Sequence, residues 1–169
     1  ARPQRELAAA GAVRASGAAR VDLLVVAQMV EPGARVLDVG CGTGDAALLA
    51  SRFVGSRGAV VGIDASGTAI ATARQRAHER RATNVTFLRG SLDLYTSTER
   101  FDAVIGRFVL MHQPDPVATV WRLATLVRDG GVLAFQEFDL TQRPFVRPEL
   151  RLAVEAFQWI TATLAGLGV

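Results

Sequence analysis

Residues 36–45 read VLDVGCGTGD, a short apolar run followed by three glycines at alternate positions and a carboxylate. The run over 34–39 is apolar apart from Arg35 and Asp38, which is typical of a strand buried on both faces of a sheet. The glycines allow a tight turn over 40–44 and let a ligand approach the backbone closely. The stretch therefore predicts a strand, a glycine turn and a helix start, with a nucleotide-like ligand at the carboxyl end of the strand.

Strand and helix patterns alternate along the chain after this stretch. Helices are predicted over 45–54, from Ser66 as the capping residue to about Arg80, and over 116–127; further strands are predicted over 59–63, 85–88, 101–105 and 132–138. The last strand follows a turn at residues 129–131, and the helix between the third and fourth strands is replaced by a short segment or missing. The alternation predicts an α/β fold, a doubly wound, mostly parallel sheet with right-handed crossovers.

Length and composition favour a single domain over residues 1–169. With 169 residues and 50% hydrophobic composition the chain can bury one sizeable core. We expect N-terminal helices over 1–33, a ligand-binding core over 34–139 and the start of a substrate-side helical segment over 140–169. In that last segment one helix face is shared by Leu150, Ala153, Phe157, Ile160 and Leu164.

The charged residues exclude several kinds of chemistry. All 19 basic residues are arginines, set against 16 acidic residues. Since there is no lysine, a P-loop, a Schiff base and a Ser–Lys mechanism are excluded. The net charge of only +3 makes a nucleic-acid partner unlikely on electrostatic grounds.

Cysteine and histidine are too few for a metal centre. Cys41 is the only cysteine, and with His78 and His112 it cannot complete a multi-cysteine zinc site, so we expect no metal. A single cysteine is typical of a protein of the reducing cytoplasm. The apolar stretch over 21–30 is interrupted by two polar residues and is far shorter than the ~20 residues that span a bilayer, so we expect no membrane partner.

The spacing of the glycines distinguishes two adenosine-containing ligands. A dinucleotide site requires G-x-G-x-x-G, so that the pyrophosphate can lie on the helix N-terminus. Here the third glycine, Gly44, comes one place early, and Asp45 occupies the expected position. A carboxylate in the first turn of the helix would repel a phosphate. S-adenosylmethionine has no phosphate and carries a sulfonium cation, so it would tolerate Asp38 and Asp45.

A further carboxylate, Asp64, ends the second predicted strand. Its position about 20 residues beyond the glycine turn suits a bidentate hydrogen bond to both hydroxyls of a ribose. This feature serves either ligand, so it supports an adenosyl group without choosing between them. The alternative role of Asp64 is that of a charge at the N-terminus of the following helix.

Four stretches resemble the motifs of the class I S-adenosylmethionine-dependent methyltransferases. VLDVGCGTGD (36–45) resembles their first motif and VVGID (60–64) their second. FDAVIGRFVLMHQPDP (101–116) is similar to their fourth-strand segment, and LVRDGGVLAFQEFD (126–139) to their turn and fifth strand. The resemblance implies a Rossmann-like methyltransferase fold that binds S-adenosylmethionine and releases S-adenosylhomocysteine.

The resemblance also implies the cofactor contacts. Gly40, Cys41 and Gly42, with Asp38 nearby, would contact the methionine moiety, and Arg107 would lie near the same end of the cofactor. Asp64 and Ala65 would contact the ribose. Ser91 and Leu92 would contact the adenine. The family often has an aspartate where this chain has Ser91, and Asp93 is an alternative for the adenine contact. Arg107 replaces a commoner small polar residue and can pair with the cofactor carboxylate.

Methyl transfer from a sulfonium depends mainly on proximity and orientation, so little catalytic machinery is expected. If the reaction uses a base, His112 is the candidate catalytic residue, because it follows the fourth strand on the ligand side; a structural role is the alternative. His78 lies on a basic, solvated helix end. Glu137 and Asp139 are either substrate-facing or solvated strand-end carboxylates. Cys41 is explained by the need for a small residue rather than by nucleophilic chemistry.

The leading hypothesis is a methyltransferase acting on an O, N or C nucleophile of a small molecule. The alternatives are a nicotinamide-dependent oxidoreductase and a non-catalytic relative that binds partners. The amino-methyltransferases that act on nucleic-acid bases have motifs such as an Asn-Pro-Pro-Tyr run after the fourth strand. This chain has no such run, so methylation of a nucleobase is less favoured. Members of the resembled family complete the sheet with further strands, so we expect that the sequence is truncated after the fifth strand or that a homodimer partner or another chain covers the open edge.

Overall fold

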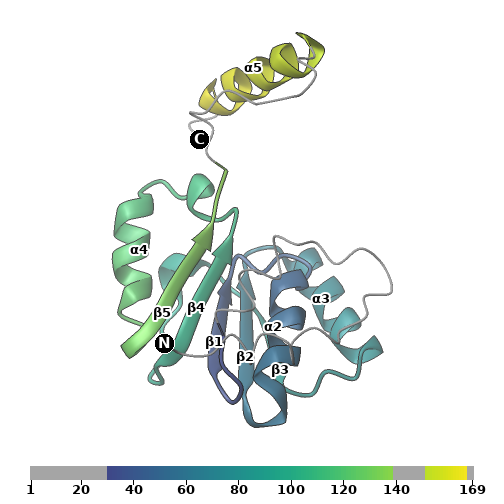
Figure 1. Cartoon of the computed structure of the whole chain (residues 1–169), viewed down its shortest axis with the longest axis vertical. Helices are drawn as coiled ribbons and strands as arrows, with labels where there is room; N and C mark the ends of the chain where they lie inside the picture. The colour runs from purple at the N-terminus through teal and green to yellow at the C-terminus, as the bar shows by residue number, and fades with distance from the viewer. Residues whose placement is uncertain (1–29, 139–150, 167–169) are drawn as a thin grey trace, which may run out of the picture.

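The computed structural model of the chain describes residues 30–138 and 151–166 (Figure 1). Its centre is a five-stranded sheet in the order β3-β2-β1-β4-β5, in which every pairing is parallel. The strands are β1 Arg35–Val39, β2 Ala59–Asp64, β3 Val85–Arg89, β4 Phe101–Arg107 and β5 Val127–Gln136. The helices are α2 Asp45–Val54, α3 Gly67–Glu79, α4 Pro116–Ala124 and α5 Arg151–Gly166. The predicted doubly wound α/β architecture is confirmed.

The chain moves outward from β1 to β3 and then crosses back to β4 on the other side of β1. This change of direction opens a crevice at the carboxyl ends of β1 and β4, which is where open α/β sheets bind their ligands. A short 3₁₀ turn, Leu92–Leu94, takes the place of a helix between β3 and β4, as the sequence predicted.

β1 is buried on both faces, as its apolar sequence predicted. Val36 belongs to a cluster that packs against α2 and α3, whereas Leu37 and Val39 belong to a second cluster that includes Leu123 of α4. Figure 1 shows α2 and α3 on one side of the molecule and α4 on the other. The predicted cap of α3 is also present, because the Ser66 hydroxyl accepts a hydrogen bond from the backbone N–H of Ala69.

The predicted end of α4 and the predicted start of β5 are wrong. α4 ends at Ala124 instead of 127, and β5 begins at Val127, ahead of the turn predicted at 129–131. These turn residues form an irregularity within β5, since Phe101 of β4 pairs with Val127 whereas Ala103 pairs with Val132. Pairing with β4 therefore overrides the local preference of the Asp-Gly-Gly sequence for a separate turn.

The two ends of the chain are described only in part. Residues 1–29, most of the segment predicted as N-terminal helices over 1–33, and residues 139–150, Asp139 included, lie outside the described residues. The domain boundaries at 33 and 139 stay predictions. The helix predicted near the C-terminus is present as α5, beyond the end of β5 in Figure 1. Among the described helices, none combines the length and apolar character needed to cross a membrane.

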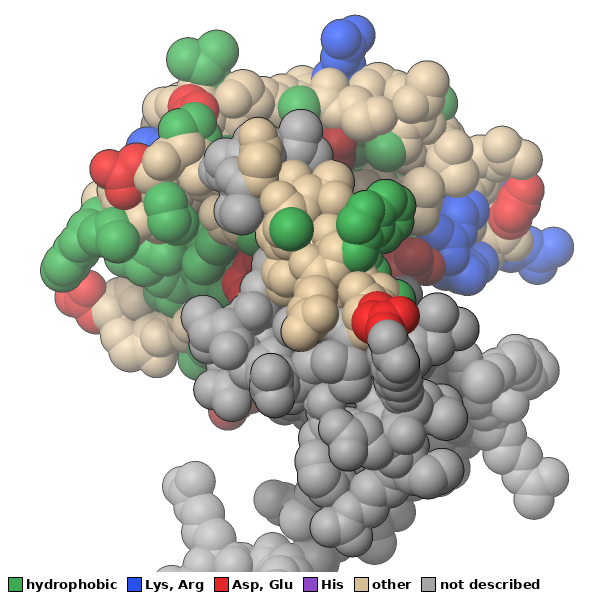
Figure 2. Space-filling model, turned by 90° about the horizontal axis from the view of Figure 1, so that it is seen from above, with side chains coloured by type: hydrophobic (Ala, Val, Ile, Leu, Met, Phe, Trp, Pro, Cys, Tyr) green, Lys and Arg blue, Asp and Glu red, His purple; other side chains and the backbone are tan. Residues whose placement is uncertain are grey.

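The surface has two sides of different character. Figure 2 shows hydrophobic side chains gathered on the side of α4 and basic side chains on the side of α3. Val117 and Trp121 of α4 are largely exposed, as are Arg80 and Arg81 at the end of α3.

Candidate functional site

Two cavities lie at the carboxyl ends of the central strands and share Gly40. The turn cavity, about 260 Å³, is lined by Asp38, Gly40, Cys41, Gly42, Thr43, Asp45, Ala46 and Arg107. The Asp64 cavity, about 280 Å³, is lined by Gly40, Asp64, Ala65, Gly90, Ser91, Leu92, Phe108, Val109, His112 and Gln113. Apart from the alternative Asp93, every residue that the sequence predicted for cofactor contact or as the catalytic base lines one of the two. A larger cavity of about 480 Å³ lies at the amino ends of β1 and β4 and contains none of them.

The glycine turn is shaped by close contacts that only glycine permits. Gly40 has φ 61°, and a Cβ there would lie 1.9 Å from Cγ2 of Val109. Gly44 has φ 84°, and its Cβ would lie 2.7 Å from the ring of Phe87. A Cβ on Gly42 would meet nothing within 4 Å. The turn is therefore pressed against the protein at Gly40 and Gly44 and open to the turn cavity at Gly42.

Asp64 holds the glycine turn and the start of α3 together. Its Oδ2 accepts a hydrogen bond from the backbone N–H of Gly42, and its Oδ1 accepts one from that of Ser66, both at 2.8 Å. A carboxylate has about four acceptor sites, so each oxygen can accept one more hydrogen bond from the Asp64 cavity. Asp64 thus contacts the helix start, the alternative role predicted for it, and keeps the capacity to bind a diol.

Asp38 is a buried carboxyl beside the turn cavity, only 2% exposed. Burial raises its pKa to about 7, although the backbone N–H of Ala47 and the guanidinium of Arg107 act in the opposite direction. Its Oδ2 has no hydrogen-bond partner among the described residues. A buried carboxyl oxygen of this kind favours a ligand group that is cationic and can donate a hydrogen bond.

Cys41 lies in the turn with its side chain buried. Burial raises the pKa of its thiol, and the carboxyls of Asp38 and Asp64 add to the effect. Because the thiolate is the reactive form, the thiol is poorly suited to act as a nucleophile. This environment agrees with the prediction of a small residue rather than a reactive one.

Arg76 of α3 braces the glycine turn, a role that the sequence did not predict. Its guanidinium donates hydrogen bonds to the backbone oxygen and hydroxyl of Thr43, at 2.8 and 3.0 Å, and forms an ion pair with Asp45. Burial acts to raise the pKa of Asp45, but the hydrogen bond and charge of Arg76, together with the charges of Arg107 and Arg80, lower it overall. Arg76 therefore offsets part of the negative charge that was expected to repel a phosphate.

We expect Arg76→Gln to lower the free energy of unfolding by about 1 kcal/mol, because a partly exposed ion pair and its hydrogen bonds are lost. Arg52→Gln removes an exposed arginine from α2 and is the matched control. Urea unfolding of both variants measures the difference. Equal stability of the two variants would show that Arg76 does not brace the turn.

The loop after β4 is fixed to the end of β5. Phe108 has φ 56°, and its backbone N–H donates a hydrogen bond of 2.9 Å to the carbonyl oxygen of Gln136. Oε1 of Glu137 accepts hydrogen bonds from the backbone N–H groups of Val109 and Leu110, both at 2.9 Å. The sequence analysis gave a solvated strand-end carboxylate as one role for Glu137, and these hydrogen bonds show that this role is wrong. Glu137 holds the segment that supplies Phe108 and Val109 to the Asp64 cavity.

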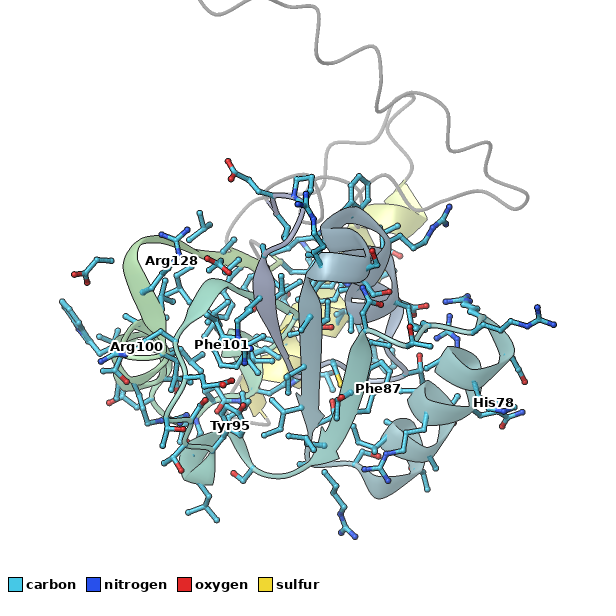
Figure 3. All side chains as sticks on the ribbon, turned by 90° about the horizontal axis from the view of Figure 1, so that it is seen from below. His78, Phe87, Tyr95, Arg100, Phe101 and Arg128 are labelled. Carbon is cyan, nitrogen blue, oxygen red and sulfur yellow. The ribbon has the colours of Figure 1, made fainter. Side chains whose placement is uncertain are left out.

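The two histidines occupy different environments. His112 is exposed on the 3₁₀ turn Leu110–His112 and lines the Asp64 cavity. His78 lies at the outer end of α3 and points away from the sheet (Figure 3). Of the two, only His112 can reach a molecule bound in the crevice, as the sequence predicted.

The adenine end of the predicted site is formed by Ser91 and Leu92. The Ser91 hydroxyl accepts a hydrogen bond from the backbone N–H of Asp93, and Leu92 is buried. Asp93 forms an ion pair with Arg122 of α4 at 3.5 Å and does not line the cavity, so it is poorly placed to replace the missing aspartate. Among the described residues no group of three or more potential metal ligands occurs.

Sequence reasoning missed part of the lining of the Asp64 cavity, and it missed Arg76 beside the glycine turn. Phe108, Val109 and Gln113 lie within the stretch 101–116 that resembles the family's fourth-strand segment, so that stretch was a usable signal for them. Arg76 carried no such signal, because its partners Thr43 and Asp45 lie more than thirty residues away in sequence.

Residues 30–162 match a family described as a methyltransferase domain. The aklanonic acid methyltransferase of a Streptomyces strain is 37% identical over 122 residues, which cover 69% of this chain and 54% of that protein. The 2-phytyl-1,4-naphtoquinone methyltransferase of Synechococcus elongatus is 31% identical over 137 residues, which cover 80% of this chain and 58% of that protein. The chain thus spans about half the length of the curated relatives it matches.

A solved structure shares the fold. The crystal structure of a SAM-dependent methyltransferase from Aquifex aeolicus superposes with a TM-score of 0.62 at 20% sequence identity, covering 79% of this chain and 77% of that one. At this identity the likeness supports the arrangement of strands and helices alone.

Proposed function

The chain belongs to the methyltransferase domain family, and from this premise we propose that it is the cofactor-binding part of an S-adenosylmethionine-dependent methyltransferase. The cofactor supplies an electrophilic methyl group: a lone pair of the acceptor bonds to the methyl carbon, the carbon–sulfur electron pair returns to sulfur, and S-adenosylhomocysteine is released. A protonated acceptor also loses its proton. The residues of the chain bind the cofactor, orient it and shape the place of the acceptor.

The turn cavity suits the methionine end of the cofactor. The unpartnered Oδ2 of Asp38 can accept a hydrogen bond from the ammonium group of the cofactor. The carboxylate group of the cofactor can pair with the guanidinium of Arg107. The backbone at Gly42 is open to the cavity, which allows close approach of the methionine chain near Cys41.

The Asp64 cavity suits the adenosine end. The free acceptor capacity of Asp64 matches the two ribose hydroxyls, with Ala65 beside them. Leu92 offers an apolar surface for the adenine, and Ser91 a polar edge. Gly40, which lines both cavities, would then lie beside the sulfonium that joins the two halves of the ligand. This junction of two chemically matched cavities at Gly40 is the observation that carries the proposal.

We infer that the acceptor is a small molecule that reacts through O, N or C. The two relatives described above are named for aklanonic acid and a phytyl naphthoquinone, both small molecules. His112, which lines the Asp64 cavity, is the proposed base for an acceptor that must lose a proton. The exposed basic residues Arg80 and Arg81 follow the end of α3 and line neither cavity, so a nucleic acid is the less favoured acceptor.

Two further parts of the proposal concern the surroundings of the chain. The single, buried thiol of Cys41 fits a reducing cytoplasm. Among the described residues β5 pairs only with β4, so we propose that further sheet, a second copy of the chain or another protein covers this edge.

Isothermal titration calorimetry of the chain with S-adenosylhomocysteine and, separately, with NADH tests the proposal. We expect binding of S-adenosylhomocysteine and no binding of NADH. Binding of NADH alone would favour the nicotinamide-dependent oxidoreductase. If neither ligand bound to a chain shown by circular dichroism to be folded, the non-catalytic relative would be the better assignment.

A further inference from the structure

A stacked pair of aromatic rings lies beside the Asp64 cavity. The rings of Phe108 and Phe138 are stacked, with centroids 4.2 Å apart and planes inclined by 4°. Phe108 lines the Asp64 cavity, and the guanidinium carbon of Arg107, which lines the turn cavity, lies 5.0 Å from the centre of the Phe108 ring. Phe108 therefore lies in the wall of one cavity next to a residue of the other, and Phe138 stacks on it.

The outer ring of the pair is open to a ligand. Phe138 is 61% exposed, although it is a large apolar side chain. Parallel stacking on Phe108 presents a flat apolar surface on which a further ring could stack. An exposed aromatic surface next to a ligand cavity is more informative than a single exposed hydrophobic residue elsewhere on the surface.

The inner ring is held in place at a conformational cost. Phe108 has φ 56°, which is rare for a bulky residue and raises the energy of the backbone. The conformation is kept by the hydrogen bond from Phe108 N–H to Gln136 and by the two hydrogen bonds that Glu137 accepts from Val109 and Leu110. Strain that the surroundings maintain is concentrated at functional sites.

The same loop lies against the glycine turn. Val109 packs so closely on Gly40 that a Cβ there would lie 1.9 Å from its Cγ2. Since the proposed function puts the sulfonium beside Gly40, the loop that carries Phe108 adjoins the position of the methyl group. A molecule lying on the aromatic pair would thus be a neighbour of that methyl group.

We propose that the stacked Phe108–Phe138 pair is the binding surface for the methyl acceptor, and that the acceptor is a planar aromatic compound. The inference rests on the proposed function, because the position of the methyl group comes from it. A flat ring can extend the stack, whereas a puckered, saturated ring loses much of this contact.

The test uses alizarin, a planar hydroxylated anthraquinone, as the probe. Its absorbance change is titrated with the 169-residue chain saturated with S-adenosylhomocysteine, whose own binding is measured by calorimetry in every variant. Cholate, a fused-ring carboxylate that is saturated and not planar, is the control ligand. Trp121→Leu, which removes an aromatic side chain 73% exposed on α4, is the matched control for Phe138→Leu.

We expect alizarin to bind and cholate not to bind. Phe138→Leu should weaken alizarin binding about tenfold and leave S-adenosylhomocysteine binding unchanged, because a stacked ring contributes about that much beyond its buried area. Trp121→Leu should change neither.

Three results would overturn the inference while the proposed function stands: no alizarin binding by a chain that binds S-adenosylhomocysteine, equal alizarin binding by Phe138→Leu, or equal binding of cholate. The first would indicate that another part of the chain or a partner protein covers the aromatic pair, and the second that alizarin binds away from Phe138. Failure of the unmodified chain to bind S-adenosylhomocysteine would instead overturn the proposed function, and the acceptor surface with it.

Discussion

Replacing Asp64 with asparagine is expected to weaken the binding of S-adenosylhomocysteine about a hundredfold. The carboxylate would accept charge-assisted hydrogen bonds from two ribose hydroxyls, and losing the charge costs about 3 kcal/mol in total. Asparagine also places an NH₂ donor against the backbone N–H of either Gly42 or Ser66, which would loosen the glycine turn. Calorimetric titration measures the change in affinity.

Asp129→Asn is the matched control for Asp64→Asn, because Asp129 is exposed within the irregular stretch of β5 at the other end of the sheet. The control should bind S-adenosylhomocysteine as the unmodified chain does. If Asp64→Asn remains folded and its affinity falls less than about threefold, Asp64 does not bind the ribose.

The stability of the ligand-free chain is expected to fall by about 2–3 kcal/mol between pH 5 and pH 8 because of Asp38. Burial raises the pKa of Asp38 to about 7 in the folded chain, against an ordinary value of 3.8 when the chain unfolds. The folded state therefore binds the proton more tightly. The resulting stabilisation is complete below pH 3.8 and is lost as the pH rises through 7.

Binding of the cofactor should show the opposite dependence on pH. The ammonium group pairs with the ionised form of Asp38, so the affinity for S-adenosylhomocysteine should rise towards pH 7 and level off above it, with a proton released on binding. Asp45 and Asp102, whose pKa values are lowered, lose their stabilising effect only in more acidic solution. The window from pH 5 to 8 therefore reports mainly on Asp38 among these carboxyls.

Asp38→Asn separates this effect from other titrations. Asparagine keeps the shape of the side chain but cannot ionise, so the variant should lose the pH dependence of stability and bind S-adenosylhomocysteine more weakly above pH 7. Thermal unfolding and calorimetry at several pH values provide both measurements. An unchanged slope of stability against pH would assign the dependence to other groups.

The sheet and the glycine turn could be predicted because their signals are local. A run of apolar residues such as that in β1 reports burial on both faces, as the opposite packing of Val36 and Leu37 shows. Glycine spacing reports backbone conformation directly, and the positive φ values of Gly40 and Gly44 agree with it. Ser66 capped its helix for the same local reason.

The start of β5 could not be predicted, because it depends on a partner strand. The sequence over 129–131 favours a turn, but pairing of Val127 with Phe101 continues the strand through it. The choice is made by β4, more than twenty residues earlier in the chain, and no local pattern records it.

The proposed acceptor side of the site was missed for a similar reason. The roles of Phe108 and Glu137 arise only when the ends of β4 and β5 lie side by side. Nothing in the local sequence indicates that Phe108 adopts a left-handed conformation or that Glu137 binds two backbone N–H groups 27 and 28 residues away. Sequence motifs thus identified the cofactor side of the crevice more fully than its outer side.

A crystal structure of the chain soaked with S-adenosylhomocysteine tests the central claim most directly. We expect the ribose to lie on Asp64, the sulfur beside Gly40, and the amino acid end between Asp38 and Arg107. A ligand bound anywhere else, or side chains filling the space next to Asp64 while the ligand is present in excess, would contradict the account.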